Sequence, residues 1–205
     1  MIHRHPSDAM LLAYAAGTLP VPHGIVLRTH LALCAECREA VRLGAELGGA
    51  LLDDAAPIAL APDALDRTLA RLDEPQAHRP PRRSQTTVEE FATGRWWWLG
   101  PGIHLMPLIP RDRDDARLDL IRVAPGVALP GHGHAGSEIT CVLRGAFGDE
   151  TGEYHVGDVA EGDEGLDHAP VALPVGSECV CLIATTGRLR AHGWVARLVQ
   201  PVFGI

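Results

Sequence analysis

The first seventy residues carry their hydrophobic positions at the spacing of α-helices. Ser7 and Asp8 can cap the apolar run AMLLAYAAG, which Gly17 is placed to end. After a turn that contains two prolines, LPVPHG, the apolar positions of IVLRTHLALCAECREAVRLGAELGGALL again follow helical spacing. These patterns predict helix from residue 7 to about residue 50, and PDALDRTLARLDE predicts a short amphipathic helix over 62–74.

The pattern changes after residue 74. The segment EPQAHRPPRRSQTT is rich in proline and arginine and has almost nothing to bury, which is typical of a linker. Beyond it, short alternating segments are separated by Gly, Pro and Asp; they are ARLDLIRVAPG, EITCVLRGAFGD, GEYHVGDVAEGD, ECVCLIATTG and GWVARLVQPVF. We therefore expect an α + β chain of two domains, with a helical bundle over 1–74, a linker over 75–92 and an all-β domain over 93–205.

Composition narrows the class of partner. The formal charge of −8 argues against direct nucleic-acid binding, which needs a basic surface, but it suits a protein that covers a basic partner. No apolar run approaches the roughly 18 residues that a membrane helix requires, so we expect no membrane span. The five cysteines are an odd number and the N-terminus lacks the apolar core of a signal peptide, which favours a reducing cytoplasm with free thiols.

The segment HLALCAEC brings candidate metal ligands close together. His30, Cys34 and Cys37 form an H-x3-C-x2-C pattern, and on a continuous helix they would share one face. Imidazole and thiolate are the ligands of tetrahedral zinc. A small helical domain has a marginal core, so a bound metal adds much to its stability. His5, just before the first helix, is the fourth ligand that we expect. The other candidates for that place are His3 and His23, and inert or redox-active cysteines are the alternatives to a zinc site.

A second group of candidate ligands lies in the β region, in PGHGHAGSEITCVLRG. On a strand, His132 and His134 point the same way, and Glu138 shares their parity if the chain stays extended between them. His168 is placed to join them from a later strand. Three imidazoles and one carboxylate suit zinc, iron, nickel or manganese.

The spacing of this second group resembles that of the cupins. The first cupin motif, G-x5-H-x-H-x3-E-x6-G, is matched at every position by Gly126, His132, His134, Glu138 and Gly145. The second motif is matched by Gly157, Gly165 and His168, and it departs at Asp163 and Ala172, where proline and asparagine are expected. Neither of these two departures from the motif falls on a candidate metal ligand. The resemblance implies that the β domain is a cupin barrel of the jelly-roll type.

The two clusters together resemble the ChrR-type zinc-binding anti-sigma factors over essentially the whole chain. The phrases SDAMLLAYAAGTL, THLALCAECR, GAFGDETG and RLVQPVFGI carry the likeness along with the clusters. The resemblance implies Zn²⁺ at His5, His30, Cys34 and Cys37, and Zn²⁺ or another divalent metal at His132, His134, Glu138 and His168. It also implies that the helical domain inhibits an ECF-type sigma factor, and that the cupin domain responds to singlet oxygen or organic hydroperoxides.

The sequence also allows two other functions, and it leaves the roles of three cysteines to be considered. A metal-dependent cupin enzyme, such as a dioxygenase or isomerase, is the main alternative, and a regulator that binds a small ligand without redox chemistry is another. Cys179 and Cys181 point the same way on a strand, so they are either a thiol sensor or two small core residues. Cys141 has the opposite parity to Glu138, so we expect it to face away from the metal.

Overall fold

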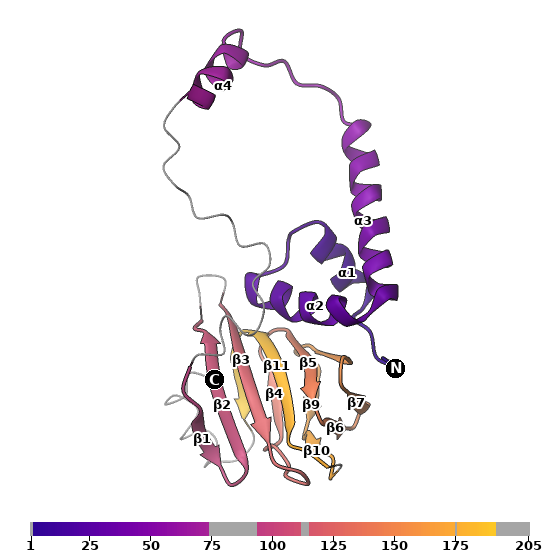
Figure 1. Cartoon of the computed structure of the whole chain (residues 1–205), viewed down its shortest axis with the longest axis vertical. Coiled ribbons are helices and arrows are strands. Elements are labelled where there is room, and N and C mark those ends of the chain that lie inside the picture. Colours follow the sequence, from indigo (N-terminus) through magenta and orange to yellow (C-terminus); the bar gives the residue numbers. More distant parts are fainter. Residues whose placement is uncertain (1, 74–93, 112–114, 175, 192–205) are drawn as a thin grey trace.

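A computed structural model places residues 2–73, 94–111, 115–174 and 176–191. Within them, the chain runs through helices into a sheet-rich domain, so the expected α + β architecture is confirmed (Figure 1). The linker expected over 75–92 lies outside the described residues, and so does the end of the β domain from residue 192. None of the helices in the described ranges is long and apolar enough to cross a membrane.

The helices are α1 (Asp8–Ala15), α2 (Val21–Leu33), α3 (Ala35–Asp53) and α4 (Ala64–Asp73). Ser7 caps α1 as predicted, because its hydroxyl accepts a hydrogen bond from the amide of Met10 at 3.3 Å. Gly17 follows α1 with φ +69°, a left-handed conformation that glycine adopts without strain. Helix α2 begins at Val21 with proline in its first turn, so it starts inside the segment that the sequence predicted as a turn.

The continuous helix predicted across HLALCAECR is wrong. Cys34 has an extended backbone (φ −103°, ψ 110°) that ends α2 and begins α3. Its sulfur accepts a hydrogen bond from the amide of Cys37 at 3.4 Å, so the side chain acts as the N-cap of α3. The two helices therefore meet at a bend, and His30, Cys34 and Cys37 gather at this bend instead of lining one helix face.

The strands form three antiparallel sheets. They are β1 (Trp97–Gly100), β2 (Ile103–Ile109), β3 (Ala116–Val123), β4 (His132–His134), β5 (Glu138–Arg144), β6 (Ala146–Asp149), β7 (Gly152–His155), β8 (Val159–Gly162), β9 (Asp167–His168), β10 (Val171–Ala172), β11 (Cys179–Thr186) and β12 (Leu189–Ala191). The largest sheet has the strand order β1-β2-β3-β11-β5-β8, and the smaller sheets have the orders β10-β6-β7 and β12-β4-β9. This arrangement brings β4 and β9, which carry the candidate histidines, directly beside each other.

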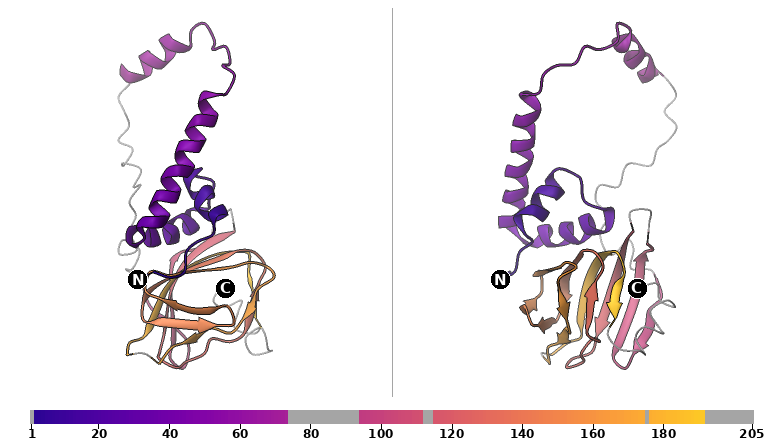
Figure 2. Two further views of the ribbon diagram at one scale, coloured as in Figure 1. Left: turned by 90° about the vertical axis from the view of Figure 1, so that its right-hand side faces the viewer. Right: turned by 180° about the vertical axis from the view of Figure 1, so that it is seen from behind.

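The helical part and the barrel share one hydrophobic core. Val26 and Leu27 of α2 are fully buried in a cluster that also contains Leu120 of β3, Ile139 of β5 and Leu182 of β11. Successive side chains of a strand point to opposite faces, so the large sheet buries one face against α2 and the other inside the barrel. Figures 1 and 2 show α2 against the barrel with α1 on its far side next to α3, whereas α3 runs away from the barrel and α4 lies at the far end.

Candidate metal centres

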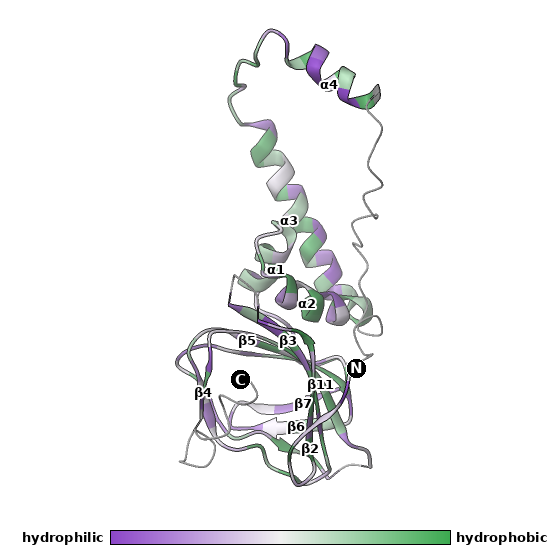
Figure 3. Cartoon of the chain, turned by 90° about the vertical axis from the view of Figure 1, so that its left-hand side faces the viewer, coloured by the Kyte–Doolittle hydropathy of each residue, from purple (hydrophilic) through white to green (hydrophobic). Residues whose placement is uncertain are grey.

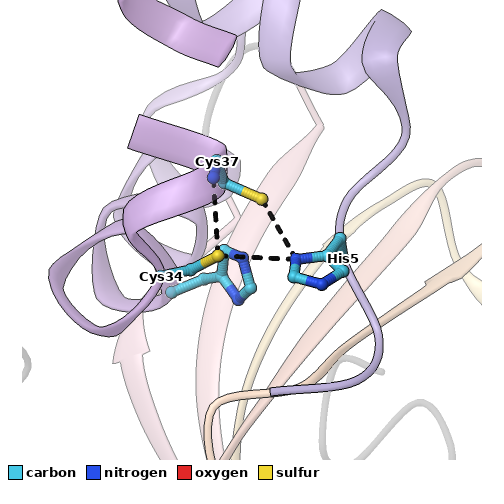
Figure 4. Close-up of side chains that lie close together, drawn as sticks. His5, Cys34 and Cys37 are labelled. Atoms are coloured by element: carbon cyan, nitrogen blue, oxygen red, sulfur yellow. Dashed lines mark hydrogen bonds between the residues drawn. The ribbon is translucent and has the colours of Figure 1, made fainter. Parts of the chain in front are cut away.

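The first centre lies at the bend between α2 and α3. The candidate ligand atoms of His5, His30, Cys34 and Cys37 all lie within 4.8 Å of one another. His5 comes from the extended segment before α1, and its Nδ1 is 3.4 Å from the sulfur of Cys34 and 3.3 Å from that of Cys37 (Figure 4). The structure thus brings together all four residues that we predicted from the sequence as candidate zinc ligands.

The outer nitrogen of His30 has a hydrogen-bond acceptor, and that of His5 faces a carboxylate at a longer distance. The Nδ1 of His30 is 2.7 Å from the carbonyl oxygen of Gly157, to which it can donate, while its Nε2 is buried without a protein partner among the described residues. The Nε2 of His5 lies 3.9 Å from the carboxylate of Glu36. Histidines that bind metals typically donate their second N–H to a carbonyl or carboxylate in this way. This geometry leaves one nitrogen of each ring for an ion.

The electrostatics of the first centre also fit a cation. Burial, together with the neighbouring Cys34 sulfur, raises the pKa of the Cys37 thiol to about 12. Burial also lowers the pKa of His30, which favours a neutral ring. Two thiols and two imidazoles at this spacing match the donor set of a closed tetrahedral zinc site, in which the cation would stabilise the thiolates.

The other two candidates for the fourth metal ligand, His3 and His23, make contacts outside this group. His3 contributes its backbone amide, which donates to a carboxylate oxygen of Asp158 at 2.7 Å. His23 is buried on α2, and its Nε2 lies 3.1 Å from the hydroxyl of Ser137 in the barrel. Neither belongs to the group that meets at the bend.

The second centre lies where β4 meets β9. The Nε2 atom of His168 is 3.2 Å from that of His132 and 3.3 Å from that of His134, so three imidazoles converge on one point. The cross-strand pairing of His132 with His168 produces this convergence. Glu138 lies beside this group, with a carboxylate oxygen 3.7 Å from Nδ1 of His134, and the turn over residues 135–137 interrupts the extended chain that we expected between them.

Each of the three rings has an acceptor near its Nδ1. For His132 it is the carbonyl of Pro130 at 2.9 Å, and for His168 it is a carboxylate oxygen of Asp149 at 2.8 Å. For His134 the neighbouring carboxylate is that of Glu138, which at 3.7 Å is beyond hydrogen-bond distance. Sequence reasoning missed Asp149, because it comes from β6 and no spacing motif connects it with His168. The two hydrogen bonds would fix the tautomers of His132 and His168 so that their Nε2 atoms face the same point as that of His134.

Burial controls protonation at this centre. It lowers the pKa of His134 to about 4, with the neighbouring rings of His132 and His168 adding to the shift, so this ring is neutral at physiological pH. Burial raises the pKa of Glu138. The neutral ring of His134 next to a desolvated carboxylate suits a divalent cation, which would favour the ionised carboxylate.

The remaining cysteines are buried thiols. Cys141 packs in the core shared with the helices, on the opposite face of the sheet from Glu138, as its parity predicted. Cys179 and Cys181 lie on β11 with their sulfurs 3.6 Å apart, in the hydrophobic cluster on the barrel side. They face the same way, and both are core residues.

Fold and site together define a cupin that carries, in its N-terminal helical part, a second group of side chains that could hold a metal, this one of histidines and cysteines. Residues 84–188 match the family model of the ChrR cupin-like domain. The chain is 40% identical to the anti-sigma-E factor ChrR of Cereibacter sphaeroides over 100% of its length and 99% of the relative. It is also similar to the crystal structure of Rhodobacter sphaeroides SigE in complex with the anti-sigma ChrR, with 40% identity and a TM-score of 0.72, covering 90% of this chain and 99% of that chain.

An RmlC-like cupin of Ralstonia eutropha is a more distant match, with 18% identity, a TM-score of 0.44 and coverage of 47% of this chain and 65% of that chain. The identity over the whole chain, not the barrel alone, decides the family. This protein belongs to the ChrR family of anti-sigma factors.

Proposed function

We propose that this protein is a cytoplasmic anti-sigma factor that binds and inhibits an ECF-type sigma factor through its helices, and that its cupin barrel senses the signal that ends inhibition. The relative in the solved complex is an anti-sigma factor bound to SigE. The observation in this chain that carries the proposal is an exposed row of leucines on α3 and α4, turned away from the shared core.

These leucines form what we term the apolar helix face, which consists of Leu43, Leu47 and Leu51 of α3 and Leu65, Leu69 and Leu72 of α4. They recur at intervals of three and four residues, so each set lies on one side of its helix. Their exposed fractions lie between 50% and 69%, although leucine is among the residues most often buried. Figure 3 shows hydrophobic positions continuing along α3 beyond α1 and reappearing in α4. Such a face is typical of a helix that docks in a partner's groove.

The charge of the protein suits the partner that we propose. The formal charge is −8, and a sigma factor must keep basic surfaces for DNA. An acidic protein with apolar helices can cover such surfaces, with the charges guiding association and the leucines providing burial.

The two metal centres have different roles in this proposal. Zinc at His5, His30, Cys34 and Cys37 would join the N-terminal segment, α2 and α3, and so fix the angle at which α3 presents its leucines. In the barrel we propose His132, His134, His168 and Glu138 as ligands of zinc or another divalent metal. The signal that we propose for this centre is an oxidant such as singlet oxygen or an organic hydroperoxide.

The likeness to an anti-sigma factor over the full chain supports a regulator and not the cupin enzyme considered from the sequence. The hypothesis of a metal-dependent cupin enzyme rested on the second group of candidate ligands alone, and it assigned no role to the helices or to the first centre.

The apolar helix face can be tested in the full-length, zinc-loaded protein. We expect Leu47→Asp with Leu69→Asp to weaken binding to an ECF sigma factor from the same organism by at least about 100-fold, because two leucines that should be buried each become charged. Ala45→Asp and Ala70→Asp place the same charge on the opposite sides of the same helices, and this control should bind as the unaltered protein does. Equal loss in both pairs, measured by isothermal titration calorimetry, would rule out the apolar helix face as the binding surface.

A further inference from the structure

One corner of the barrel touches both metal centres. It runs from β6 through β7 and the following turn into β8, residues 146–162. At one end of this corner, Asp149 contacts His168 of the second centre at 2.8 Å. At the other end, the carbonyl of Gly157 contacts His30 of the first centre at 2.7 Å. The corner therefore holds an outer partner of a histidine in each centre.

We propose that this corner couples the two centres, so that metal held in the barrel strengthens metal binding at the bend between α2 and α3. Asp149, Thr151 and Tyr154 act as positioning residues that connect His168 with the N-terminal segment. Gly157 and Asp158 complete the connection to His30 and His5. The proposal rests on metal being held at both centres and is independent of the sigma factor.

The connection from His168 runs through short hydrogen bonds. The carboxylate of Asp149 that faces His168 also accepts from the amide of Thr151 at 2.8 Å and from its hydroxyl at 2.5 Å. The same Thr151 hydroxyl lies 2.7 Å from the phenol oxygen of Tyr154. Because Asp149 uses one oxygen for His168 and the other for Thr151, a rotation of the histidine ring must disturb the turn.

Arg4 carries the connection into the N-terminal segment. Its guanidinium lies over the ring of Tyr154, 5.6 Å from the centroid, and donates to the carbonyl of Thr151 at 3.5 Å. Its backbone is fixed on both sides, since its amide donates to Asp158 at 3.1 Å and its carbonyl accepts from the amide of Val159 at 3.1 Å. The next residue is His5, so a shift of this segment moves a ligand of the first centre.

The turn after β7 holds the same segment from the other side. Asp158 is fully buried and also accepts from the amides of His3 and His155. Gly157 has φ +89°, and a Cβ there would lie 3.0 Å from the side chain of Ile2. A larger residue would push the N-terminal segment away, so this glycine allows the close approach that brings its carbonyl to His30.

Metal binding at the barrel centre is the event that we expect to affect the first centre. An ion on Nε2 of His168 fixes its ring and strengthens the hydrogen bond from Nδ1 to Asp149. Losing that ion would free the ring and remove one constraint on Asp149 and Thr151. The first centre would then lose part of the support that orients His5 and His30, and outer partners of this kind affect metal affinity by about 10–100-fold.

Cobalt distinguishes the centres in the full-length protein. Only the first centre offers thiolate ligands, so the thiolate-to-cobalt absorption of Co²⁺-loaded protein reports that centre alone. We would measure how fast excess EDTA removes this absorption in four proteins, namely the unaltered chain, His132→Ala, Tyr154→Phe and the double variant. His132→Ala disables the barrel centre without touching Asp149, and Tyr154→Phe removes only the hydroxyl that bonds Thr151.

We expect His132→Ala to speed cobalt loss from the first centre by about 5- to 50-fold, in the usual range of coupling between sites. In the Tyr154→Phe background the same change should have a smaller effect, because the contact from Thr151 to the ring beneath Arg4 is lost while that from its carbonyl to Arg4 remains. Thr151→Val should act like Tyr154→Phe. Tyr14→Phe alters the chain's other tyrosine, on α1, and should leave the full effect of His132→Ala.

Two results would overturn the proposal. One is equal loss of cobalt from the unaltered chain and His132→Ala. The other is a full effect of His132→Ala in both the Tyr154→Phe and Thr151→Val backgrounds. If Ser137→Ala abolished the effect in that second case, the coupling would instead run from the barrel into α2 through His23. Because the absorption is read without a sigma factor, a failure here is distinct from failure of the anti-sigma function.

Discussion

Leu27→Ala tests whether the helices and the barrel unfold as one unit. Leu27 is 0% exposed and packs in a core built from α2 and the large sheet. Replacing a fully buried leucine by alanine costs about 3 kcal/mol, from lost burial and from the cavity left behind. In a chain of 205 residues this corresponds to a fall in Tm of about 6–12 °C.

Two probes separate the parts of the molecule in this experiment. Trp96, Trp97 and Trp98 lie at the start of the barrel and report it, whereas the thiolate–cobalt absorption reports the first centre. Because the core is shared, Leu27→Ala should move both transitions by the same amount in guanidinium chloride. Leu47→Ala, at a leucine that is 57% exposed, should change stability by less than about 0.5 kcal/mol. A shift of the helical transition alone, with the barrel transition unchanged, would refute a shared core.

Three further predictions concern single contacts. Asp149→Asn should lower the metal affinity of the barrel by about 10–100-fold, measured by chelator competition, because His168 loses its charged partner; the neighbouring Glu150→Gln should not. Gly157→Ala should lower the denaturation midpoint more than Gly126→Ala, because both glycines have positive φ but only Gly157 crowds a side chain, and equal losses would contradict this. His23 has a pKa lowered by burial, so the unfolded chain takes up more protons and stability falls as pH drops below about 6.5; His23→Gln should flatten that slope in denaturation measured from about pH 7 to 5.

Most of the candidate ligands could be identified from the sequence because their spacing is local. His132 and His134 alternate on a strand, and His30, Cys34 and Cys37 lie within eight residues, so each pattern is visible without knowing the fold. The outer partners could not be predicted in this way. Gly157 acts on His30 through its backbone carbonyl, which no residue type encodes, and it reaches His30 only because the turn between β7 and β8 lies against α2.

The helix break and the shared core show two other limits of pattern reading. The apolar periodicity continues across Cys34, but its sulfur caps the next helix and overrides that periodicity locally. Strand β5 has apolar residues on both of its faces, with Ile139 and Cys141 in the core shared with the helices and Val142 in the cluster on the barrel side. That pattern could not identify α2 as the cover. For this reason the full chain, and not the isolated helical segment, is the proper material for binding experiments.

Transcription by an ECF sigma factor with RNA polymerase core tests the central claim most directly. The zinc-loaded full-length protein should abolish run-off transcription from that sigma factor's promoter at stoichiometric amounts, and should leave transcription by an unrelated sigma factor unchanged. Cys34→Ser with Cys37→Ser, which removes both thiolates of the first centre, should relieve the inhibition. Unimpaired transcription in the presence of folded, zinc-loaded protein would contradict the assignment as an anti-sigma factor.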